Sequence, residues 1–176
     1  MNASTTALTT ASSASSSAAP AASAVLGERP LPPGFRPLRI GSETDFLALT
    51  GPFAMKIADG QLNLGFYVQP KHCNVAGICH GGMLLTFADI QMAIAGKHQE
   101  DLQGFHMTVS LTCDFLGAGK LGGWMEGRTE VVRNVDRTLF AQCILTCDGE
   151  TVLRASAVFR EGAASPEMME RMRLKS

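Results

Sequence analysis

The chain has 176 residues, of which 45% are apolar and 18% are charged, so it is expected to form one globular domain with a sizeable core. Its formal net charge of −1 provides no general attraction for nucleic acid or for an anionic membrane surface. No apolar run reaches the length that spans a membrane, which leaves a cytoplasmic protein as the expectation.

The two ends of the chain differ in composition from its middle. Residues 1–27 are rich in Ala, Ser and Thr and carry no charged side chain, so we expect a disordered tail with little to bury. Residues 28–162 are predicted to form a single domain. Residues 163–176 read as a polar C-terminal tail that could be helical.

The five cysteines are an odd number without a CxxC pair, so neither a disulfide framework nor a zinc site is predicted. Most are expected to be small core residues in a reducing compartment. Cys79 precedes His80, which raises the question of a Cys/His nucleophile pair. Adjacent residues of an extended chain point to opposite faces, and this argues against such a pair.

The first predicted elements are a proline-rich extended lead-in at 28–41 and a short helix within 42–51, with Ser42 as its cap. Residues 61–70 alternate apolar and polar side chains and end in proline, which predicts a strand. Residues 81–99 form the only long helix candidate, with Gly96 expected near its end. Apolar side chains cover nearly every face of this segment, as is typical of a buried helix.

Four strands are predicted after the helix, at 105–116, 123–133, 138–148 and 150–160. In the first, strict alternation places Val109, Leu111 and Cys113 on one face and Thr108, Ser110 and Thr112 on the other. Asp148-Gly149 predicts a tight hairpin turn between the last two. The order predicts an α+β fold, an antiparallel sheet wrapped around one helix. Its uncovered edge favours a dimer.

Asp89 lies in the middle of the apolar helix, with no Lys or Arg three or four residues away to pair with it. A carboxylate without a partner is costly to bury and persists where chemistry needs a base. In the alternative interpretation, Asp89 faces solvent or accepts a hydrogen bond from Thr86.

His80, Gly81 and Gly82 stand where the helix begins. A helix N-terminus offers unpaired N–H groups and partial positive charge, and glycine lets a ligand approach the backbone closely. A carbonyl oxygen placed there would be polarised as it becomes an oxyanion. Plain chain geometry at the helix entry explains the glycines equally well, and a lone histidine is more often structural than catalytic.

Gly81 and Asp89 are eight residues apart, which is about 12 Å along an ideal helix. A base must lie within hydrogen-bond reach of the reacting group, or one water away. One chain therefore cannot comfortably supply both groups to one carbonyl, whereas two antiparallel helices across a twofold axis can. The spacing predicts a site shared by two subunits.

The pattern Asn74-x2-Gly77-x2-His80-Gly81-Gly82, followed by Asp89, resembles the PaaI-like branch of the hotdog-fold acyl-CoA thioesterases, in the 4HBT thioesterase superfamily. The run GAGKLGGW at 117–124 is similar to that family's loop after the central strand, and the match spans about residues 45 to 160. The resemblance implies a five- or six-stranded antiparallel sheet around one long central helix. It also implies homodimers, expected to pair as dimers of dimers.

The resemblance also implies thioester hydrolysis without a metal or other cofactor, with coenzyme A entering as part of the substrate. Asp89 would be the general base or nucleophile, and Asn74 would orient the water or the thioester. The Gly81 N–H would polarise the carbonyl, and His80 would hold the loop. Thr108 is the best match for an assisting hydroxyl residue, with Ser110 as the rival.

Coenzyme A carries phosphates, which need cations or other donors. Family members bind it near the loops after the third and fourth strands, which implies Lys120, Arg133 and Arg137 here, with Asn134 and Gly82 as further donors. Each of these charges, taken alone, is more often a solvated surface group. Two other functions stay open. A hotdog hydratase or dehydratase typically uses a differently placed histidine, and a non-catalytic acyl-CoA sensor would not need Asp89.

Overall fold

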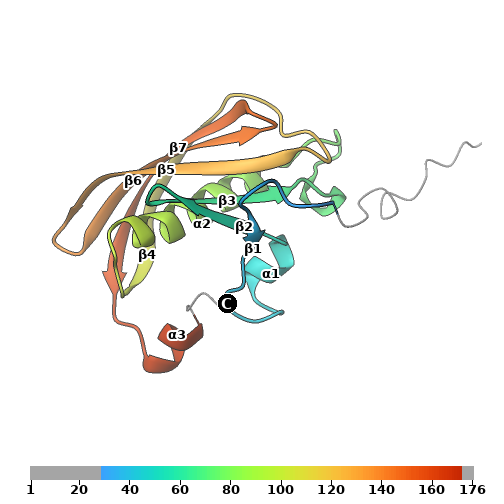
Figure 1. Ribbon diagram of the computed structural model, residues 1–176. Coiled ribbons are helices and arrows are strands. Elements are labelled where there is room, and N and C mark those ends of the chain that lie inside the picture. The colour runs from blue at the N-terminus through green and yellow to red at the C-terminus, as the bar shows by residue number, and fades with distance from the viewer. Residues whose placement is uncertain (1–28, 172–176) are drawn as a thin grey trace, which may run out of the picture.

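The computed structural model describes residues 29–171, so the tail predicted at 1–27 and the last residues, 172–176, lie outside the described part. Figure 1 shows a curved sheet that covers the long helix α2, with α1 and α3 on the same side of the sheet as α2. The elements in chain order are β1 (Arg36–Pro37), α1 (Phe46–Thr50), β2 (Ala54–Ala58), β3 (Gln61–Tyr67), the 3-10 turn η2 (Pro70–His72), α2 (Gly81–Gln99), β4 (Phe105–Phe115), β5 (Trp124–Val135), β6 (Thr138–Cys147), β7 (Glu150–Gly162) and α3 (Pro166–Arg171).

The sheet is antiparallel and its strands follow the order β1-β2-β3-β5-β6-β7-β4. The predicted α+β architecture is confirmed, but the sheet has seven strands rather than five or six. The additional strands are β1 and β2, with two and five residues. Such short segments hold too few residues to show a clear alternation of polar and apolar side chains.

Helix α2 spans the predicted residues and buries most of its faces. Gly96 does not end it: a Cβ there would lie 2.7 Å from Leu139 Cδ2, so this glycine lets the helix pack closely on β6. Among residues 29–171, no helix is long and apolar enough to cross a membrane.

The short helix α1 begins later than Ser42 suggested, because Asp45 occupies the cap position. The Asp45 carboxylate accepts the backbone N–H of Ser42 at 2.8 Å and also binds Arg171 of α3. Ser42 is therefore a donor to the true cap residue and not the cap itself.

A β-bulge in β4 overturns the strict alternation predicted for this strand. Thr108 pairs with Phe159 and Ser110 pairs with Val158, which leaves Val109 as the extra residue. An extra residue reverses the facing of everything before it. Thr108 therefore shares the inward face with Leu111 and Cys113, while Ser110 stays on the outer face.

The hairpin between β6 and β7 is the one predicted from Asp148-Gly149. Cys147 pairs with Glu150 around the two-residue loop, and both loop residues have positive φ, 51° and 87°. This is the backbone conformation that the favoured two-residue hairpin turn requires.

Gln91 of α2 joins two strands where the sheet opens. Strands β3 and β5 pair only through Gly65, Phe66 and Tyr67, so the first half of β3 lacks a partner on that side. The buried Gln91 side chain accepts the Leu64 N–H at 2.7 Å and donates to Leu62 O at 3.1 Å and to Thr129 Oγ1 at 3.0 Å. Its amide thus replaces ladder hydrogen bonds across the opening.

Replacing Gln91 by leucine should lower the free energy of unfolding by about 3 kcal/mol, because a buried N–H and a buried C=O lose their partners. Urea unfolding of Gln91→Leu checks this. The matched control is Gln142→Leu on the exposed outer face, where a change within about 0.5 kcal/mol is expected. Equal stability of both variants would contradict the bridging role of Gln91.

Candidate active site

The start of α2 leaves one backbone donor free. The Gly82 N–H binds His80 Nδ1 at 2.8 Å, and the N–H groups of Met83 and Leu84 bind His80 O at 2.8 and 3.1 Å. Within the described residues, the Gly81 N–H has no acceptor. The first helical N–H is therefore available to a carbonyl oxygen, as the sequence predicts for Gly81. Gly82, predicted to contact coenzyme A, has its N–H occupied.

His80 and its neighbours fix this helix start to the rest of the fold. The His80 N–H binds His72 O at 2.8 Å, and the Cys79 N–H binds Gly119 O at 2.7 Å. His72 is itself anchored, with Nδ1 accepting from Gln69 N at 3.0 Å and Nε2 donating to Thr50 O at 2.8 Å. Burial lowers the pKa of His72, which keeps its ring neutral and preserves this pair of roles.

Asn74 closes the turn that precedes the helix. Its Oδ1 accepts the N–H of Ala76 at 2.9 Å and that of Ile78 at 3.4 Å, so this oxygen is committed to the turn. Among the described residues, the Asn74 Nδ2 group has no acceptor. The side chain can therefore act on a ligand only as a hydrogen-bond donor.

Asp89 meets a hydroxyl group from β4. Thr108 Oγ1 donates to Asp89 Oδ1 at 2.7 Å, whereas Ser110, the rival residue, lies on the outer face of the sheet. The bulge at Val109 makes this contact possible because it turns Thr108 toward α2. Asp89 is half-buried and accepts from Thr108 rather than from Thr86.

One face of α2 is left partly open in the single chain. Gly81, Leu85 and Asp89 follow at intervals of four residues and so share this face. Leu85 is 37% exposed, whereas the neighbouring Leu84 and Phe87 of the same helix are buried. Beside it lies β4, the last strand of the sheet, with Met107 and Val109 exposed. Sequence reasoning missed Leu85, although its spacing from the two predicted site residues was visible.

The residues predicted to bind coenzyme A lie at two opposite ends of α2. Lys120 is near the helix start, because it forms a β-bridge with Ile78. Asn134 lies at the helix end, where its Nδ2 binds Glu100 at 3.2 Å. Arg137 forms an ion pair with Glu161 at 3.1 Å, while Arg133 is exposed and has no ion pair within residues 29–171. A single chain does not bring Lys120 and these β5–β6 residues together.

The cysteine next to His80 is a core residue. Cys79 is only 4% exposed, and burial raises the pKa of its thiol to about 12. A nucleophilic cysteine needs an accessible thiolate near neutral pH. The His80 ring is also engaged in capping the helix, so the Cys/His nucleophile pair is not formed.

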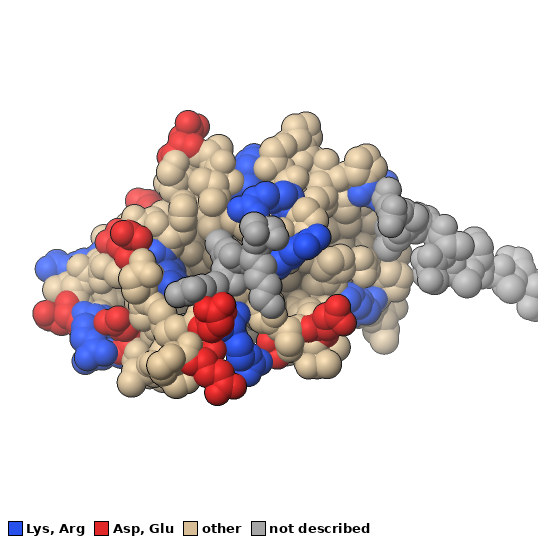
Figure 2. All heavy atoms as spheres, turned by 60° about the horizontal axis from the view of Figure 1, so that its bottom comes forward, with Lys and Arg blue, Asp and Glu red and all other residues tan. Residues whose placement is uncertain are grey.

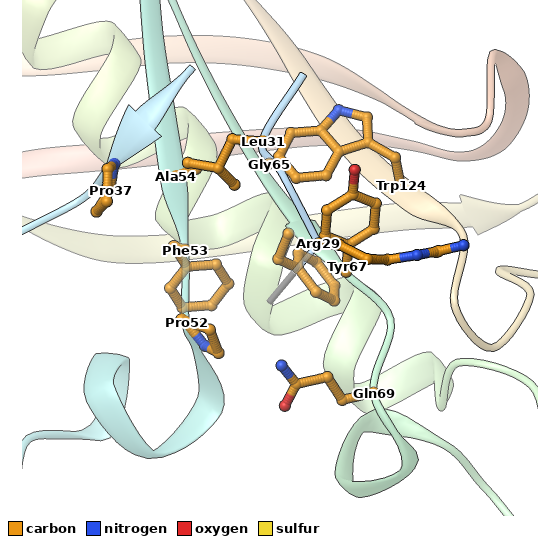
Figure 3. A pocket seen from close by; sticks show the side chains of 11 residues that line it. Arg29, Leu31, Pro37, Pro52, Phe53, Ala54, Gly65, Tyr67, Gln69 and Trp124 are labelled. Carbon is orange, nitrogen blue, oxygen red and sulfur yellow. The ribbon is translucent and has the colours of Figure 1, made fainter. Parts of the chain in front are cut away.

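Two surface features lie apart from these residues. Figure 2 shows side chains of both signs scattered over the face that carries α1 and α3. A cavity of about 460 Å³ is lined by Phe53, Tyr67 and Trp124 among others, and the ring centroids of Tyr67 and Trp124 are 4.9 Å apart. Figure 3 shows the side chains that line it. None of the predicted site residues lines this cavity.

The sequence matches a thioesterase family model and a protein named as an esterase. The family model described as the thioesterase superfamily matches residues 76–153. The Pseudomonas aeruginosa protein named "Putative esterase PA0474" is 36% identical over 130 residues, which cover 73% of this chain and 96% of that protein.

Two solved structures share the fold. The Escherichia coli PaaI protein, from the phenylacetic acid degradation operon, has a TM-score of 0.61 at 21% identity and covers 70% of this chain and 88% of its own. A hypothetical thioesterase from Streptococcus pneumoniae, solved with coenzyme A, has a TM-score of 0.55 at 25% identity. The match covers 63% of this chain and 86% of that protein's chain. The predicted hotdog fold is confirmed, and the chain belongs to the thioesterase superfamily.

Proposed function

We propose that the protein hydrolyses acyl-CoA thioesters to a carboxylic acid and coenzyme A, as a homodimer with two shared sites. The observation that carries the proposal is the free Gly81 N–H on the same helix face as the Asp89–Thr108 pair. Superfamily membership supports thioester hydrolysis in general. The coenzyme A in the Streptococcus pneumoniae structure supports the choice of thiol.

The proposed dimer follows from the spacing along α2. Leu85 is midway between Gly81 and Asp89, so two antiparallel helices with their Leu85 side chains in contact at the twofold axis place each Gly81 opposite the partner's Asp89. This arrangement covers the exposed Leu85 and brings the free edge strand β4, with its exposed Met107 and Val109, next to the partner. It also unites the two halves that about 12 Å of helix keeps apart in one chain.

The same geometry lets cationic side chains of both chains bind one coenzyme A molecule. In an antiparallel pair centred on Leu85, the C-terminal end of the partner's α2 extends about 15 Å past Gly81, beyond the N-terminus of the first helix. The partner's Arg133 is near that end, while Lys120 of the first chain is near the helix start. An extended coenzyme A whose thioester lies at Gly81 can thus reach cations of both chains with its phosphates.

In the proposed reaction, the thioester oxygen accepts the Gly81 N–H and the partner's Asp89 faces the carbonyl carbon. Asp89 removes a proton from water, and the resulting hydroxide adds to the carbon while the oxygen becomes an oxyanion at the N–H. Collapse breaks the C–S bond, and the thiolate takes the proton from Asp89. Direct attack by the Asp89 carboxylate, followed by hydrolysis of the anhydride, uses the same groups. Asn74 Nδ2 is the donor that orients the water or the thioester.

Substitution of Asp89 by asparagine should reduce kcat by about 10²- to 10⁴-fold, because the base or nucleophile is lost while the shape is kept. Thr108→Val should cost about tenfold through the lost hydrogen bond to Asp89. Release of free thiol from acyl-CoA measures both. The control is Ser110→Ala, on the outer face of the same strand, with unchanged turnover expected. Full activity of Asp89→Asn would rule out the assigned role.

Gly81 permits a test that removes only its N–H group. Proline is tolerated at the first helical position, and the extended His80 (ψ 138°) suits a following proline. Gly81→Pro should therefore leave the dimer folded but lower kcat by roughly 10²- to 10³-fold, the cost of one oxyanion donor.

Gly81→Ala is the matched control, because alanine adds a Cβ where proline also has one but keeps the backbone N–H. It should lose less than about tenfold in kcat through crowding against Phe115. Similar losses in the two variants would mean that crowding, and not the missing donor, limits the reaction.

A further inference from the structure

Phe115 lies directly beside Gly81, the residue whose N–H is free. A Cβ built on Gly81 would stand 3.2 and 3.3 Å from Cε1 and Cζ of the Phe115 ring, which is closer than ordinary contact. The ring therefore fills the space on one side of Gly81. Any carbonyl group that accepts the Gly81 N–H must fit past this ring.

The backbone that carries the ring is held on both sides of Phe115. Phe115 pairs with Leu153 of β7, and the next two N–H groups, of Leu116 and Gly117, bind Val152 O at 2.9 and 3.2 Å. On the outer face, the preceding Asp114 forms an ion pair with Arg154 at 2.6 Å. The segment thus places the Phe115 Cα and Cβ beside the helix start in a defined way, as selection by shape requires.

The Phe115 ring does not belong to the core of its own chain. Phe115 stands on the inward face of β4, since its partner Leu153 is fully buried, yet 56% of Phe115 is exposed. Val75, before the helix start, and Leu116, next to Phe115, are also apolar and exposed. Such a surround suits the hydrocarbon part of an acyl group, whereas the phosphate-bearing end is drawn to cations such as Lys120.

We propose that Phe115 is a specificity-determining residue that excludes acyl groups branched at the carbon next to the thioester carbonyl. The inference rests on the proposed hydrolysis of acyl-CoA at Gly81. An unbranched acyl group presents a CH2 at that carbon and passes the ring, whereas a methyl branch meets it. One misplaced methyl group in a packed site is worth about tenfold or more in kcat/KM.

The test compares two isomeric substrates, hexanoyl-CoA and 2-methylpentanoyl-CoA, with the full-length wild-type protein and with Phe115→Ala and Phe115→Leu. We expect the wild type to prefer the straight chain, and Phe115→Ala to reduce that preference by about tenfold, mainly through faster turnover of the branched isomer. Phe115→Leu should give an intermediate preference. The matched control is Phe140→Leu, a phenylalanine on the outer face of β6, with an unchanged preference expected.

An unchanged preference in both Phe115 variants would overturn the inference while leaving the proposed function intact. If that unchanged preference came with an equal rise of KM for both isomers, the ring would lie against the pantetheine arm instead. Failure of the wild type to hydrolyse either isomer, or any other acyl-CoA, would overturn the proposed function and this inference together.

Discussion

Gly81 and Asp89 lie two turns apart on one rigid helix, so the free N–H and the carboxylate of a single chain stay about 12 Å from each other. Both lie on the face of α2 that is left partly open in the single chain, with Leu85 between them. In the proposed dimer, a second copy of the chain covers the exposed Leu85, lies against the free edge of β4 and completes the site. The proposed activity depends on this pairing, because neither half has the groups for hydrolysis alone.

The other faces of α2 hold the fold together and thereby fix the helix that carries the site. Gln91 joins β3 to β5 where their ladder ends, and Gly96 lets β6 pack closely. At the helix start, His80 consumes the N–H groups of residues 82–84 and leaves that of Gly81. A donor that is unpaired and already oriented needs no reorganisation when charge develops on a carbonyl oxygen. The capping geometry of His80 is thus as relevant to the proposed chemistry as Gly81 itself.

Much of this could be predicted from local patterns. The apolar run at 81–99, the HGG start and Asp148-Gly149 each have a direct physical signature, and the helix, its entry and the hairpin are found where they were expected. The contact between Thr108 and Asp89 could not be derived from alternation, because the bulge at Val109 reverses the facing of Thr108 and leaves no mark in the sequence. The bridging role of Gln91 depends on how β3 and β5 separate, and the place of Phe115 depends on the β4–β7 register. These are tertiary facts that no single segment encodes.

The shared site is tested most directly by mixing two inactive variants, Gly81→Pro and Asp89→Asn, under conditions that exchange subunits. In a mixed dimer, one site combines the intact Gly81 of one chain with the intact Asp89 of the other, while the second site lacks both. Random pairing of equal amounts should therefore restore about a quarter of the wild-type thiol release. Activity no higher than the average of the two separate variants, in samples shown to contain mixed dimers, would contradict a site built from two chains.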